Sequence, residues 1–133
     1  MALPTLKIGD FSIKYPIVLG AMGIGVTRNE LASAVTNAGG LGVLSGVNLG
    51  FNEADFLSNR LDANLRALKR EIQLAKEKTK NGIVGINFMV AMNAYAEHVK
   101  VAVKEGIDLI VSGAGLPTEL PQFVKDTKTK IAP

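Results

Sequence analysis

The residues best suited to chemistry in this sequence follow directly after runs of apolar residues. Residues 16–27 read Pro-Ile-Val-Leu-Gly-Ala-Met-Gly-Ile-Gly-Val-Thr, a buried-strand pattern that ends in glycines 20, 23 and 25. Glycine leaves the backbone N–H groups uncovered, so a flat ring or an anion can approach the main chain there. The alternative interpretation is a tight strand-to-helix turn that binds nothing.

Asn87 is the strongest single polar candidate. It lies near the far end of residues 83–90, which are apolar at nearly every other position. Its carboxamide offers two donors and an acceptor, which suits the amide-like edge of a heterocyclic ring. The alternative is an asparagine at a strand end that bonds a neighbouring loop.

Other reactive side chains are scarce. Ser45 and Ser112 follow apolar runs, but His98, the one histidine, falls within an expected helix and is predicted to lie on the surface. A serine nucleophile therefore lacks a base, and such a mechanism is not expected. The absence of cysteine excludes thiol nucleophiles and zinc–thiolate sites, and a single histidine excludes a multi-histidine metal site.

The composition is that of an ordinary globular protein. The 133 residues are 47% hydrophobic and 20% charged, which fits a single domain over residues 1–133. Much of the net charge of +3 comes from basic residues between 60 and 80, interpreted as the solvated face of a helix and not a nucleic-acid site. Apolar runs are of strand length and no leader opens the chain, so a cytoplasmic protein without membrane association is expected.

Strands and helices are expected to alternate along the chain. A hairpin over residues 6–13 turns at Gly9-Asp10 with a positive φ, and Thr27 with Glu30 has the spacing of a capping box. Hydrophobic periodicity and stop signals predict strands near 16–20, 41–45, 83–90, 107–111 and 130–133, and helices near 28–38, 61–78, 94–104 and 118–127, the last capped by Thr118.

Four βα units followed by a strand require a parallel sheet with right-handed crossovers. Two architectures satisfy this order: a doubly wound, flavodoxin-like sheet and the first half of a (βα)₈ barrel. In both, ligands bind at the carboxyl ends of the strands. We therefore expect residues 20–25, 45–46, 87–92 and 112–115 to converge on one rim.

Four blocks of the sequence resemble the nitronate monooxygenase family, formerly called 2-nitropropane dioxygenases. They are Pro16–Gly23, Leu31–Gly42, Gly85–Met89 and Val111–Gly115, and flavin-dependent enoyl-acyl-carrier-protein reductases are similar too. The resemblance implies the N-terminal half of an FMN-binding TIM barrel and an oxidoreductase acting on a small molecule. Its reaction would be oxidation of alkyl nitronates with O₂ or, alternatively, NAD(P)H-dependent reduction of an enoyl thioester. The competing hypothesis is a non-catalytic flavodoxin-like binding domain or an inactive fragment of the enzyme.

The resemblance also implies roles for individual residues. Ala21, Met22 and Gly23 would line the flavin ring, Asn87 would hydrogen-bond to it, and Ser112 and Gly113 would face the substrate. No catalytic residue is implied, because the sequence has Ser112–Gly115 where typical nitronate monooxygenases carry a histidine, and Gly-Ala-Gly-x-Pro is closer to the enoyl reductases. The family's FMN phosphate loops lie in later strands. The chain alone is therefore expected to bind FMN weakly or not at all, and to associate through open sheet edges.

Overall fold

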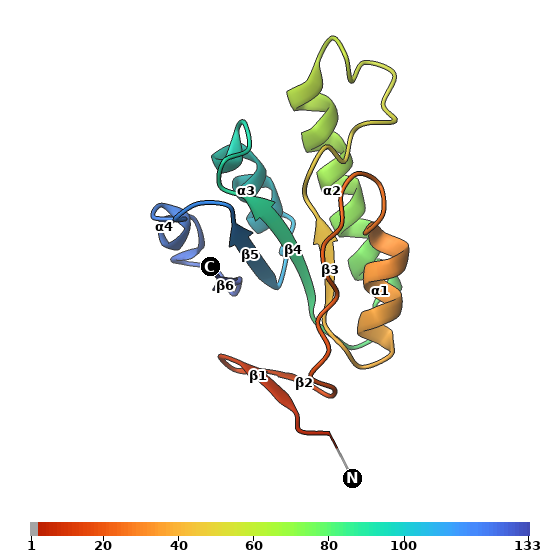
Figure 1. Cartoon of the computed structure of the whole chain (residues 1–133), viewed down its shortest axis with the longest axis vertical. Coiled ribbons are helices and arrows are strands. Elements are labelled where there is room, and N and C mark those ends of the chain that lie inside the picture. Colours follow the sequence, from red (N-terminus) through yellow and green to blue (C-terminus); the bar gives the residue numbers. More distant parts are fainter. Residues whose placement is uncertain (1–2) are drawn as a thin grey trace.

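The computed structural model describes residues 3–133 as alternating strands and helices (Figure 1). The strands are β1 (Leu6–Ile8), β2 (Phe11–Ile13), β3 (Gly42–Ser45), β4 (Val84–Met89), β5 (Leu109–Gly113) and β6 (Lys130–Ala132). The helices are α1 (Asn29–Asn37), α2 (Arg60–Lys78), α3 (Tyr95–Lys104) and α4 (Leu120–Val124).

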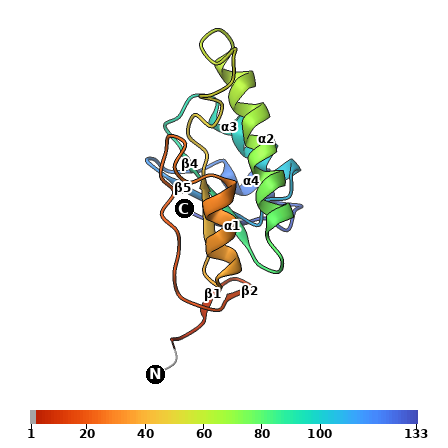
Figure 2. The same cartoon turned by 90° about the vertical axis from the view of Figure 1, so that its right-hand side faces the viewer.

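The main sheet is parallel and its strands follow chain order, β3-β4-β5-β6. A parallel β-bridge between Val18 and Leu41 places residues 17–19 beside β3. The order of the segments in the sheet therefore still follows their order in the chain. Right-handed crossovers that always step in one direction place every helix on the same side of the sheet, as Figure 2 shows. A doubly wound sheet carries helices on both sides, so the flavodoxin-like alternative is wrong for this chain.

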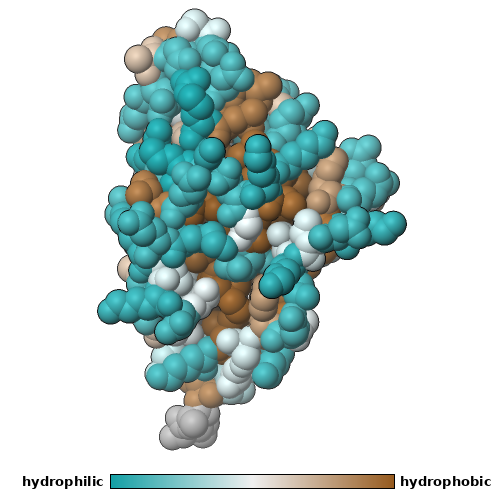
Figure 3. All heavy atoms as spheres, turned by 180° about the vertical axis from the view of Figure 1, so that it is seen from behind, coloured by the Kyte–Doolittle hydropathy of each residue, from teal (hydrophilic) through white to brown (hydrophobic). Residues whose placement is uncertain are grey.

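Apolar side chains fill two separate layers, one on each face of the sheet. Leu44, Ile86, Phe88 and Ile110 alternate toward the helices and belong to the larger core. The opposite residues Leu41, Val43 and Leu109 form a smaller cluster with Ile13. Seen from the helical side, the surface carries many hydrophilic side chains with hydrophobic ones between them (Figure 3). The sheet is therefore buried against helices on one face and lined by a second apolar cluster on the other.

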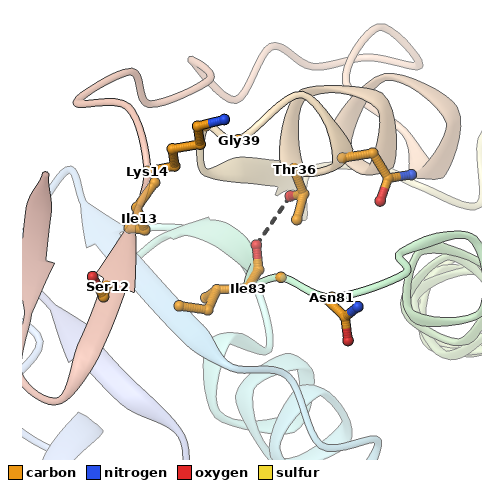
Figure 4. A pocket seen from close by; sticks show the side chains of 10 residues that line it. Ser12, Ile13, Lys14, Thr36, Gly39, Asn81 and Ile83 are labelled. Carbon is orange, nitrogen blue, oxygen red and sulfur yellow. Dashed lines mark hydrogen bonds between the residues drawn. The ribbon is translucent and has the colours of Figure 1, made fainter. Parts of the chain in front are cut away.

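The β1–β2 hairpin lies below the amino ends of the sheet strands (Figure 1). Its turn is at Gly9, with φ +58° as predicted, and Lys130 of β6 pairs with Asp10 at 2.8 Å. A pocket of about 280 Å³ opens at this end of the sheet, where Thr36 Oγ1 donates to the carbonyl of Ile83 (Figure 4). It therefore lies at the opposite end of the sheet from the expected ligand rim.

Residues 17–19 differ from the predicted buried strand. They form a single bridge, and Ile17 and Val18 are 55% and 52% exposed. The reason is their edge position, because they have a strand neighbour on one side only. These residues are extended, but the burial on both faces predicted from the hydrophobic run is wrong.

Two predicted helix starts are also wrong. The N-cap of α1 is Arg28 and not Thr27, and the N-cap of α4 is Glu119 and not Thr118. Thr27 is drawn into the glycine turn described below, so its hydroxyl does not cap the helix. Within residues 3–133, no helix has the length and apolar character needed to cross a membrane.

Candidate functional site at the carboxyl ends of the strands

Thr27 holds the glycine-rich residues 20–27 in a compact turn. Its hydroxyl accepts a hydrogen bond from Met22 N at 2.9 Å and donates one to the carbonyl of Gly20 at 3.3 Å. Its own N–H donates to the carbonyl of Met22 at 3.0 Å. Because Thr27 is fully buried, these bonds are shielded from water and keep the turn closed.

The turn is tied to β3 at both of its ends. Leu19 N donates to the carbonyl of Leu41 at 2.9 Å, and Ser45 N donates to the carbonyl of Thr27 at 3.0 Å. A Cβ on Gly23 would lie 3.3 Å from Ser45 Oγ, so a larger residue would crowd the end of β3. Glycine at this position therefore allows the turn to lie close against the strand.

Asn87 and the start of the glycine turn line one pocket. Asn87 lies opposite Ser45 of β3 and Val111 of β5 in the parallel register. The pocket measures about 280 Å³ and is lined by Val18, Leu19, Gly20, Ala21, Val43, Asn87 and Val111. Segments far apart in the sequence thus meet on the face of the sheet that the helices leave free.

The pocket is uncharged, and Asn87 is its only polar side chain. Among residues 3–133, no partner is found for the Asn87 carboxamide, although the residue is half-buried. A Cβ on Gly20 would meet no heavy atom within 4 Å, so the pocket also has open space beside the backbone. An uncharged planar group with donors and acceptors along one edge fits this combination of features.

Not all of the expected ring-facing residues line this pocket. Ala21 lines it with Asn87, whereas Met22 and Gly23 lie further along the turn, and Met22 is 48% exposed. The backbone of the turn connects all three. The roles expected for Ala21, Met22, Gly23 and Asn87 remain predictions.

Ser112 does not offer its hydroxyl to the open face of the sheet. Its Oγ lies 2.7 Å from the hydroxyl of Tyr95 on α3, and the residue is 3% exposed. Strand alternation turns Ser112 toward the helices because its neighbours Val111 and Gly113 lie on the opposite side. The Ser112 hydroxyl is therefore turned away from the open face, whereas Gly113 is exposed at the end of β5. The substrate-side position expected for both residues stays a prediction.

His98 is buried, contrary to the surface position predicted from the sequence. It is 2% exposed, and its ring lies 6.1 Å from that of Phe88, centroid to centroid. The spacing offers a signal that could have shown this. His98 follows Tyr95 by three residues and precedes Ala102 by four, so it belongs to the inward stripe of α3.

Among residues 3–133, no three His, Asp or Glu side chains lie close enough to hold a metal ion.

Comparison with known proteins identifies the family of this chain. The family model described as nitronate monooxygenase matches residues 5–132. The chain belongs to the nitronate monooxygenase family. A comparison with curated proteins finds no match.

Solved structures of FabK from Thermotoga maritima share the fold of this family member. The wild-type structure has a TM-score of 0.69 and 27% identity, covering 90% of this chain and 33% of FabK. The M276A mutant has a TM-score of 0.70 and 27% identity, covering 90% of this chain and 35% of the mutant. The chain thus spans about a third of those proteins. The barrel prediction is confirmed as a partial (βα)ₙ barrel with its strands in sequential order.

Proposed function

We propose that this chain forms the ring-binding part of an FMN site in an oxidoreductase of the nitronate monooxygenase family. The observation that carries the proposal is the pocket in which the free carboxamide of Asn87 lies with the backbone of Gly20 and Ala21. A flavin ring carries alternating N–H and C=O groups along one edge. A carboxamide and uncovered main-chain groups can bind both kinds of group, and the uncharged pocket suits an aromatic ring.

We assign a separate role to each part of the proposed FMN site. Asn87 orients the ring edge through its carboxamide, and the turn at Ala21, Met22 and Gly23 lies along the ring. Bound FMN supplies the transfer of electrons to and from a small substrate. Thr27 has an indirect role because it holds the turn closed by its bonds to Gly20 and Met22.

The proposed reaction is oxidation of alkyl nitronates with O₂, the activity after which the family is named. A second reaction, NAD(P)H-dependent reduction of an enoyl thioester, is favoured by the similarity to FabK at 27% identity. It is also favoured by the end of β5, where Ser112 turns toward Tyr95 and no histidine follows. Reduction of bound flavin by NADPH in the absence of nitronate would support the enoyl reductase reaction. Reduction of the flavin by nitronate alone would support the monooxygenase reaction.

Titration of FMN against the protein, carried to concentrations high enough to detect the weak binding expected of this chain, tests the ring site through quenching of flavin fluorescence. Asn87→Ala removes the carboxamide and leaves the strand backbone in place. We expect FMN binding to weaken about tenfold, the effect of losing one or two buried hydrogen bonds. The matched control is Asn81→Ala, which removes the same group from an exposed position at the other end of the sheet.

The control is expected to bind FMN as the wild type does. Equal FMN affinity for Asn87→Ala and the wild type would contradict the proposed role of the carboxamide. The absence of FMN binding to the whole protein would contradict the cofactor itself.

A further inference from the structure

A second pocket at the carboxyl ends of the strands lies between the β3–α2 and β4–α3 loops. It measures about 290 Å³ and is lined by Val47, Asn48, Arg60, Asn64, Met89, Ala91, Met92, Asn93 and His98. That volume is close to the lower limit of about 300 Å³ for ligand pockets, which suits a small molecule or one end of a larger one. A Cβ on Gly23 would lie 3.4 Å from Val47 Cβ, so this pocket adjoins the glycine turn.

His98 is one of the residues that line this pocket, and its buried ring carries a polar atom without a partner. Its Nδ1 lies 2.7 Å from the carbonyl of Ala94, and only a protonated nitrogen can bond to a carbonyl. In the neutral ring, Nε2 is then an acceptor without a hydrogen. Across residues 3–133, Nε2 of His98 is the one buried side-chain nitrogen or oxygen that lacks a hydrogen-bond partner. An orphaned buried acceptor is costly, so a ligand with a donor group would relieve it.

Arg60 gives the pocket a positive charge without a matching negative one. The lining contains three asparagines and this arginine, and no Asp or Glu. Arg66 and Arg70 pair with acidic residues of the β3–α2 loop, whereas Arg60 lies over the ring of Phe56 at 5.0 Å. Its guanidinium is therefore available to an anion.

The position of Arg60 at the start of the long helix α2 adds to this charge. The amino end of a helix carries a partial positive charge that favours anions. Asp62 in the first turn accepts a hydrogen bond from Asn59 Nδ2 at 3.0 Å and does not line the pocket. The polar wall therefore favours an anion with several acceptor oxygens.

We propose that this pocket binds the phosphate group of an organic phosphomonoester. At neutral pH a phosphomonoester exists partly as the monoanion, which keeps one P–OH group. Its charged oxygens accept hydrogen bonds from Arg60 and the asparagine amides, while the P–OH donates to Nε2 of His98. A sulfate or carboxylate has charged oxygens but no such proton. The apolar residues Val47, Met89 and Met92 then face the organic part of the ester.

The single histidine makes the proposal directly measurable. Because His98 is the one histidine of the chain, its two imidazole ¹⁵N signals need no assignment to a residue, and only Nδ1 and Nε2 have to be distinguished. We would titrate the full chain at neutral pH with phenyl phosphate, inorganic phosphate and sulfate, and follow the Nε2 signal. We expect saturable shifts with phenyl phosphate, at least tenfold weaker binding of inorganic phosphate, and none with sulfate in the same range.

Two variants locate the site. Arg60→Gln removes the exposed cation of the pocket, and we expect phenyl phosphate to bind about tenfold more weakly, as for the loss of one charge-assisted hydrogen bond. Lys69→Gln removes a positive charge from an exposed position of the same helix outside the pocket, and is expected to bind as the wild type does. Amide spectra of both variants would establish that they remain folded.

Each contrary result overturns a defined part of the proposal. No saturable shift of Nε2, or equal weakening by both variants, overturns the site. Binding of sulfate as tight as that of phosphate overturns the role of the P–OH group. Equal affinity for inorganic phosphate and phenyl phosphate overturns the organic ester and assigns the pocket to free phosphate. None of these measurements depends on FMN, so the proposal stands or falls independently of the flavin site.

Discussion

Asn29 and Glu71 form a buried hydrogen-bonded pair between α1 and α2, with 2.6 Å from Asn29 Nδ2 to Glu71 Oε2. The backbone N–H of Asn29 donates to the same oxygen at 3.0 Å, and Arg28 Nε donates to Glu71 Oε1 at 3.1 Å. Glu71 is completely buried, so these donors replace the water that its carboxylate loses. The pair fixes the start of α1, and with it the end of the glycine turn, against the longest helix.

Glu71→Gln is expected to lower the free energy of unfolding by about 2 kcal/mol. Removing one partner of a fully buried pair costs about 3–5 kcal/mol, and the smaller value follows because the Arg28 side chain is 28% exposed and regains water. Chemical denaturation measures the change. Glu77→Gln, on the exposed side of the same helix, is the control and should change stability by less than about 0.5 kcal/mol. Similar losses in both variants would contradict the role of the buried pair.

The same carboxylate makes stability depend on pH in the acid range. Burial alone would raise the pKa of Glu71, but hydrogen bonds from Arg28 and Asn29 outweigh it and hold the pKa below its usual 4.5. A lowered folded-state pKa means that the stabilisation is present above about pH 4.5 and is lost as the pH falls through the folded-state value. The stability difference between wild type and Glu71→Gln should therefore shrink below that pH. A stability difference between the two proteins that stays constant down to pH 3 would contradict the stabilising role of the ionised Glu71 carboxylate.

Two glycines of the turn should respond differently to alanine. Gly25 has φ +75°, and its Cβ would lie 2.7 Å from the ring of Phe51, so Gly25→Ala should cost about 1–2 kcal/mol of stability. Gly20→Ala meets no heavy atom within 4 Å and should change stability by less than about 0.5 kcal/mol. Thermal unfolding compares the two. Because the Gly20 methyl would enter the Asn87 pocket, Gly20→Ala should instead weaken FMN binding.

The hydrogen bond between Ser112 and Tyr95 is expected to act on stability and not on catalysis. Ser112→Ala and Tyr95→Phe each break the 2.7 Å contact and should each cost about 1 kcal/mol. The double variant should cost less than the sum of the two, because both remove the same bond. A loss of more than about tenfold in kcat for Ser112→Ala, with stability unchanged, would contradict this expectation and support a substrate-side role for Ser112.

The sequence predicted features that depend on near neighbours in the chain. The four-and-three spacing of apolar residues predicted α2, the apolar run predicted β4, and Gly9-Asp10 predicted a hairpin turn with positive φ. The four blocks that include Gly23 and Asn87 carried the resemblance to the family. Each of these signals is local, so the pattern and the structure agree.

The tertiary structure decided where side chains point and which order the strands take. The spacing of Thr27 and Glu30 predicts a helix cap, but the Thr27 hydroxyl bonds within the glycine turn, which is hydrogen-bonded to β3. Ser112 turns toward α3, and His98 is buried against Phe88, because the layer of helices covers only one face of the sheet. The sequential strand order, which excludes the doubly wound fold, depends on contacts between distant segments. No local pattern records such contacts, so they became visible only in three dimensions.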